Sequence, residues 1–233
     1  MLRSWLAAVL LLLSAGTAFA ADAADRTLLG FSADGRWFAF EQYGVQDGSG
    51  FPYAELYVID LDKDAWAAGT PVKALIQDEG SNVKTARDDI ARRAAPFLEK
   101  LAIGHPGRLL AGNAVGEEVS DTTRMTFRSH HNTPEQTALR LEMIPLPATC
   151  PDPGEKPMGF VLSASRSQGP VRELYRDKAV PSSRGCPLEY RLADVVAFDT
   201  PAGVTRHVVL LHMLRFGFEG RDARFIAVPV TLP

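Results

Sequence analysis

The segment TLLGFSADGRWFAFE, residues 27–41, decides the fold class of this 233-residue chain. Two apolar runs, 27–31 and 36–41, flank the turn SADG, and an Asp-Gly pair provides the positive φ angles that a tight hairpin turn needs. The next segment, AELYVIDL at 54–61, has the β-branched and aromatic content of a strand. We therefore expect an antiparallel sheet to begin at this hairpin.

Strand patterns continue along most of the chain. They cover residues 70–76, 122–130, 136–144, 159–163, 171–175, 192–198, 204–216 and 224–232. Val208–Leu211 is apolar on both faces, which predicts a central strand. Pro229 cannot donate to a ladder, so the last strand is expected at an edge. The fold class is therefore mainly β, an α+β fold with antiparallel sheets.

One segment, near 81–103, has helical periodicity. Apolar residues recur there every three or four positions, Ser81 or Asn82 can cap the start, and Gly104 can end the helix. Pro96 interrupts the pattern and predicts a kink or two short helices. Residues 21–233 are expected to form a single β-rich domain, or two sub-regions divided near 81–104.

Residues 1–20 are typical of a signal peptide. Arg3 precedes the apolar run 5–13, and Ala18-Phe19-Ala20 matches the pattern that signal peptidase cleaves. The run is too short to span a bilayer, which takes about twenty residues. We expect export to the periplasm or secretion, with no membrane span after cleavage.

Charge and cysteine content narrow the protein class further. The chain carries 25 basic and 28 acidic residues, without the basic excess of a nucleic-acid-binding protein. We therefore expect no nucleic-acid partner. The two cysteines, Cys150 and Cys186, form an even set in an exported chain, which predicts a disulfide.

Two resemblances add to these patterns. Residues 29–60 resemble one repeat of a TolB-type β-propeller, but the repeat does not recur, so we interpret it as a local β-meander. The whole mature chain is similar to a family of predicted secreted bacterial proteins of unknown function. Segments 31–35, 43–53, 181–187 and 217–225 carry that similarity. It implies export and a disulfide, and no activity.

Metal and cofactor motifs are incomplete. The acidic segment 60–64 is similar to the start of a calcium loop, but Ala65 and Pro71 stand where Gly and Glu are needed. His207 and His212 are an odd number of residues apart in one strand and point to opposite faces. No Walker or dinucleotide-binding glycine motif occurs. We expect no metal and no cofactor.

Charged, glycine-rich loops are the remaining candidates for a site. Glycine allows close backbone approach, and an arginine can bind a carboxylate or phosphate with two hydrogen bonds. We expect two or three of these loops to meet beside the sheet. The candidate binding residues are Asp34, Asp47, Ser49, Tyr53, Arg184, Glu219 and Arg221.

No catalytic residue is assigned. These loops favour a non-enzymatic periplasmic binding or protein-interaction module, whose partner is an envelope protein or a small ligand. The alternative is a cofactor-free periplasmic hydrolase in which acids such as Asp34, Asp47 or Glu219 converge, about 5 to 9 Å apart. An envelope structural protein, which would expose a large apolar patch, is the third possibility.

Overall fold

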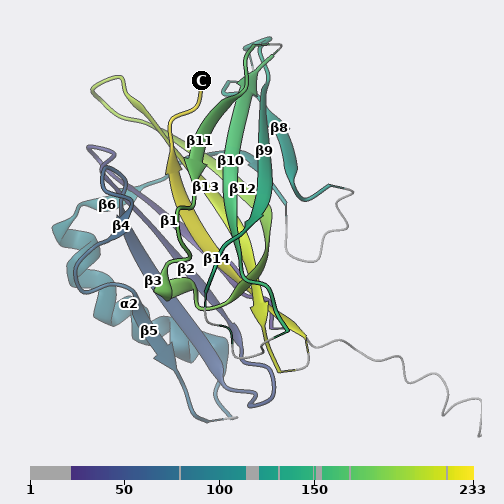
Figure 1. Ribbon diagram of the computed structural model, residues 1–233. Coiled ribbons are helices and arrows are strands. Elements are labelled where there is room, and N and C mark those ends of the chain that lie inside the picture. Colours follow the sequence, from purple (N-terminus) through teal and green to yellow (C-terminus); the bar gives the residue numbers. More distant parts are fainter. Residues whose placement is uncertain are drawn as a thin grey trace, which may run out of the picture.

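Three antiparallel sheets and a helix form four stacked layers in the computed structural model (Figure 1). The structure describes residues 22–78, 80–113, 121–130, 132–148, 150, 154–167, 169–218 and 220–233. The predicted signal peptide and Glu219 lie outside these described residues. The mainly β, antiparallel fold class is confirmed.

The first layer of strands is the N-terminal sheet, ordered β4-β3-β2-β1-β6, with β5 also pairing with β3. Its strands are β1 (Asp25–Ser32), β2 (Trp37–Val45), β3 (Pro52–Asp60), β4 (Ala65–Trp66), β5 (Val72–Leu75) and β6 (Ile103–His105). The predicted hairpin joins β1 to β2, with Gly35 at φ +71°. Gly30 has φ +103°, and a Cβ there would lie 2.4 Å from the His105 carbonyl oxygen, so β6 requires this glycine.

The helix α2 (Val83–Lys100) covers the outer face of the N-terminal sheet (Figure 1). The Asn82 side chain accepts the Thr85 N–H and caps its first turn. Buried Ala86, Ile90 and Ala94 form the stripe that packs on the sheet. The predicted helical segment near 81–103 is confirmed as one helix, and the alternative of two short helices is wrong, because α2 continues through Pro96. That proline is exposed, so water can reach the carbonyl that it leaves unpaired.

The next two layers are the central sheet and the outer sheet. The central sheet is ordered β14-β13-β12-β7, and the outer sheet β11-β10-β9-β8. Their strands are β7 (Arg108–Gly112), β12 (Pro187–Asp199), β13 (Thr205–Phe216) and β14 (Arg221–Val230), then β8 (Arg124–Phe127), β9 (Thr137–Pro145), β10 (Met158–Arg166) and β11 (Arg172–Arg176). Both positional predictions are confirmed, because β13 is internal and β14 is an edge strand.

The central sheet is buried on both faces, which explains its apolar sequence. Val208 and Leu210 pack towards the N-terminal sheet, whereas Val209 and Leu211 pack towards the outer sheet. The predicted disulfide between Cys150 and Cys186 is present. It joins the connection between β9 and β10 to the residue directly before β12. The short 3-10 helix η1 (Ser182–Arg184) also precedes β12.

The stacked layers also decide between a meander and a propeller. Residues 29–60 form the antiparallel run β1-β2-β3, as the meander interpretation predicts. The three sheets lie face to face, which differs from the radial arrangement of propeller blades (Figure 1). The division into sub-regions near 81–104 stays a prediction.

Candidate functional site

A cleft of about 280 Å³ opens where the three sheets meet at the edge strand β14. We call it the aromatic cleft. Its walls come from β2 to β5 of the N-terminal sheet, from β13 and β14, and from β11 and η1. The aromatic residues that line it are Phe40, Tyr57, Trp66, Tyr175 and Phe225. Its charged and amide-bearing residues are Gln42, Glu55, Asp64, Lys73, Arg184, Arg215 and Arg224.

Glu55, on β3, is the best-connected carboxylate of the aromatic cleft. It accepts hydrogen bonds from Gln42 Nε2 at 2.8 Å and from the Tyr57 hydroxyl at 2.6 Å, and Lys73 Nζ lies 2.7 Å away. Burial alone would raise the pKa of Glu55, but the bonds from Lys73, Tyr57 and Gln42 outweigh it and hold the pKa below its ordinary value. Glu55 is therefore ionised and fixed in position.

Gln42, on β2, joins the N-terminal sheet to the central sheet. Besides Glu55, its amide nitrogen donates to the Tyr57 hydroxyl at 3.2 Å, and its Oε1 accepts the Phe225 N–H at 2.6 Å. Gln42 is 1% exposed, so an unmade bond there would be costly. These hydrogen bonds fix the Gln42 amide between the two sheets.

The Arg184 side chain lies in the wall of the aromatic cleft but is already paired. Its Nη1 lies 2.7 Å from Asp177 Oδ2, and its guanidinium stacks 4.9 Å from the Phe160 ring centre. Burial works against its charge, but Tyr190 and Asp177 outweigh that effect and raise the pKa of Arg184. A ligand carboxylate that binds Arg184, as predicted, would therefore have to compete with Asp177 for the guanidinium.

Tyr53 belongs to a second buried cluster beside the aromatic cleft. Its hydroxyl donates to Asp22 Oδ1 at 2.8 Å, and Arg224 stacks 4.6 Å from its ring centre while pairing with Asp22. Burial is the main cause that raises the pKa of Tyr53. Tyr53 therefore supports the wall of the cleft and is not among the residues that line it.

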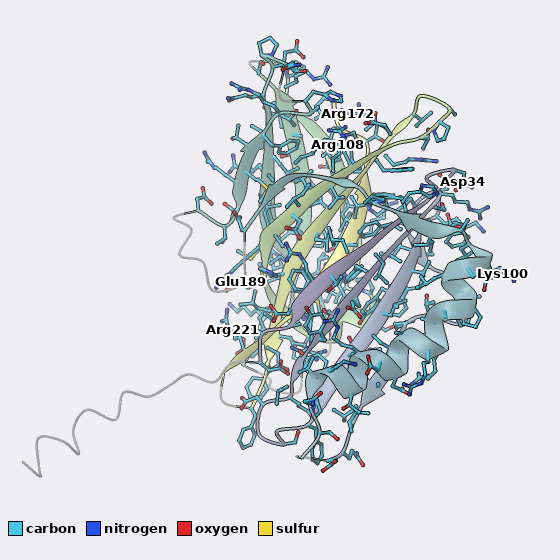
Figure 2. The ribbon with its side chains drawn as sticks, turned by 180° about the vertical axis from the view of Figure 1, so that it is seen from behind. Asp34, Lys100, Arg108, Arg172, Glu189 and Arg221 are labelled. Atoms are coloured by element: carbon cyan, nitrogen blue, oxygen red, sulfur yellow. A yellow bond between two sulfur atoms is a disulfide. The ribbon has the colours of Figure 1, made fainter. Side chains whose placement is uncertain are left out.

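The other predicted site residues lie elsewhere. Asp34 precedes β2 and Asp47 follows it, so a nine-residue strand of about 30 Å separates them. These two carboxylates do not converge. Ser49 donates to Gln46 within its own loop at 2.9 Å. Arg221 pairs with Glu189 at 2.8 Å, far from Asp34 (Figure 2).

Two of the predicted loops do approach each other. Gly48 has φ +81°, and a Cβ on it would lie 3.1 Å from the Phe218 ring. This contact brings the β2–β3 loop to the β13–β14 turn. The loop that carries Arg184 lines the aromatic cleft instead. The binding roles of all these residues stay predictions.

Charge in the aromatic cleft is nearly balanced, because each lining cation faces a carboxylate. The pairs are Lys73–Glu55 at 2.7 Å, Arg184–Asp177 at 2.7 Å, Arg224–Asp22, and Arg215–Asp222 at 3.8 Å. Asp64, at the rim, has neither a hydrogen bond nor an ion pair within the described part of the chain. Partial removal of water by the cleft walls raises the pKa of Asp64, and the charge of Arg184 opposes this effect. Asp64 is therefore the cleft carboxylate without an ion pair of its own, although the Arg184 charge acts on it.

The acidic segment 60–64 illustrates how the turn directs its side chains. Asp60 pairs with Arg36 at 2.7 Å, and Asp62 pairs with Arg206 at 2.8 Å. Asp64 alone of the three lines the aromatic cleft. Among the described residues, no group of three or more His, Cys, Asp or Glu side chains could hold a metal ion.

Sequence analysis did not find Glu55, Tyr57, Asp64 or Trp66. One signal was present, because Glu55 is the only charged residue between Pro52 and Ile59 in a strand with apolar residues on both faces. A carboxylate in such a strand must be supplied with hydrogen-bond donors. Asp64 and Trp66 carry no comparable signal.

Comparison with known protein families shows to which family this chain belongs. Residues 39–231 match the family described as predicted secreted protein (DUF2259). The chain belongs to this family. The DUF2259 description agrees with the predicted secretion, and the family resemblance is confirmed. The resemblance to a TolB-type propeller repeat receives no support.

The other comparisons assign no activity to this DUF2259 protein. No curated protein and no solved structure matches it. Within the described ranges, no helix has the length and apolar content needed to cross a bilayer.

Proposed function

We propose that this protein is a non-enzymatic binding module of the periplasm, and that the aromatic cleft holds its ligand. The observation that carries the proposal is the side-chain arrangement at the mouth of the cleft. Trp66 is 46% exposed there, and its ring lies 5.7 Å from the Tyr57 ring. An exposed tryptophan beside fixed polar groups is typical of a ligand site.

The chemistry of Glu55 favours binding over hydrolysis. Glu55 accepts hydrogen bonds from three side chains and its lowered pKa makes it a poor general acid. Tyr57, whose pKa burial raises further, stays protonated and donates to Glu55. Groups held in this way recognise a ligand without reorganising, which lowers the cost of association.

Native mass spectrometry of protein purified from its own envelope tests this proposal. We expect a retained molecule on the wild-type protein, and its loss from the Trp66→Ala variant. Phe218→Ala is the matched control, because Phe218 is 76% exposed and does not line the aromatic cleft. Equal retention by both variants would place the ligand elsewhere, and a clean mass for the wild type at high protein concentration would refute the proposal.

A further inference from the structure

The backbone of the edge strand β14 alternates between groups that face β13 and groups that face outward. Two sets of contacts identify the outward residues. The Ala223 N–H donates to the Asp22 carbonyl at 2.9 Å, and the Ala223 carbonyl accepts the Ala24 N–H at 3.1 Å. The Phe225 N–H donates to Gln42. Odd-numbered residues of β14 therefore direct their backbone groups away from β13.

The same alternation turns the backbone of Ala227 and Pro229 outward. Proline has no N–H, so an outward position costs the ladder nothing and agrees with this assignment. The groups left on the edge are the Ala227 N–H and the carbonyls of Phe225, Ala227 and Pro229. Among the described strands β14 pairs with β13 alone, so no neighbouring strand satisfies these four groups.

This open edge forms the floor of a continuous groove. The aromatic cleft includes Phe225–Ala227, and a second cleft of about 460 Å³ includes Pro229–Thr231. Asp64 and Tyr175 line both clefts and join them. One wall is the β3–β4 turn of the N-terminal sheet, and the other is β11 of the outer sheet. The central sheet therefore ends in a slot between its two neighbours.

We propose that the groove holds an extended peptide segment of another protein, which adds to β14 as a further strand of the central sheet. This inference rests on the proposed function and names the class of ligand. A row of unpaired N–H and C=O groups matches a peptide backbone, as in other cases of strand addition. The walls on both sides keep the sheet edge of a second folded copy away, whereas a single extended segment fits between them.

The groove also determines the side chains that such a peptide needs. Residues of a strand alternate between two faces, so neighbouring positions meet different walls. An apolar or aromatic side chain packs in the aromatic cleft against Tyr57 and Phe225. A lysine or arginine at the junction of the two clefts pairs with Asp64, the carboxylate left over from the ion pairs of the cleft.

Selection from a phage-displayed library of random eight-residue peptides tests the inference. We expect binders with a basic residue next to an apolar one. Amide hydrogen exchange followed by NMR then reports the binding mode, because strand addition protects the Ala227 N–H and contact through side chains alone does not. Two methylated versions of the selected peptide test the same point, one methylated at its odd-numbered backbone nitrogens and the other at its even-numbered ones. Only one of these two sets of N–H groups faces β14 in strand addition, so one version should lose binding and the other should keep it.

Asp64→Asn should weaken such a peptide at least about tenfold, since a hydrogen bond to a charged group is lost. Asp88→Asn, on α2 and paired with Lys84, is the control and should leave affinity unchanged, because Asp88 lines neither cleft. A bound peptide that leaves the Ala227 amide unprotected overturns strand addition. Failure to select any peptide, while native mass spectrometry finds a retained small molecule, overturns this inference and leaves the proposed function standing. Failure of both experiments removes both proposals.

Discussion

Replacing Asp177 with alanine should lower the free energy of unfolding by about 3 to 5 kcal/mol, the range for breaking a buried ion pair. The Asp177 side chain is 1% exposed and its partner Arg184 is 11% exposed. Asp177 also accepts the Phe160 N–H at 3.0 Å and the Tyr175 hydroxyl at 3.0 Å. The substitution therefore leaves a buried guanidinium and two further donors without their acceptor.

Urea denaturation followed by fluorescence measures this loss. With a slope of about 2 kcal/mol per M, the midpoint should fall by about 1.5 to 2.5 M while the slope stays unchanged. Glu173→Ala is the control, because Glu173 pairs with Arg176 at 2.6 Å and both side chains are 49% exposed. It should cost no more than about 1 kcal/mol. Equal midpoints for the two variants would refute the assignment of Asp177 and Arg184 as a buried pair.

Three further predictions concern stability. Reducing the Cys150–Cys186 disulfide, which spans 36 residues, should cost about 4 kcal/mol in the urea experiment, and an unchanged midpoint would contradict its role. Burial lowers the pKa of His207 and His212 to about 4, so protonation favours the unfolded chain. Stability should be full above about pH 6.5 and fall by up to about 1.4 kcal/mol per pH unit per histidine as the pH drops towards 4, and His212→Gln should flatten that slope. Asn82→Ala removes the cap of α2 and should cost about 1 kcal/mol, whereas Ser81→Ala leaves the cap in place, removes only an exposed hydrogen bond to Asp78 and should cost less.

Local sequence patterns were sufficient to predict most elements of the fold. The Asp-Gly turn predicted the first hairpin, and the apolar run Val208–Leu211 predicted a central strand. Both predictions depend only on residues that are adjacent in the chain. The sequence does not predict the strands Ile103–His105 and Arg108–Gly112, because Gly104 lies within the first and Pro106 and Gly107 lie between the two. Their pairing depends on contacts with β1 and β12 instead.

The candidate site was much less predictable. Arg184 follows two serines and precedes a glycine, a composition typical of an exposed loop. Its burial depends on Asp177, seven residues earlier, and on the Phe160 ring from another strand. Asp64 is distinguished from Asp60 and Asp62 only by where the folded turn directs its side chain. Such differences arise from tertiary contacts that a single sequence does not reveal.

The indole N–H signals of the two tryptophans test the central claim most directly. Trp37 and Trp66 are the tryptophans outside the predicted signal peptide, and only Trp66 lines the aromatic cleft. Adding a soluble extract of the producing organism's envelope to ¹⁵N-labelled protein should shift the Trp66 indole signal and leave Trp37 in place. A Trp66 signal that stays fixed, or moves no more than that of Trp37, would contradict ligand binding in the aromatic cleft.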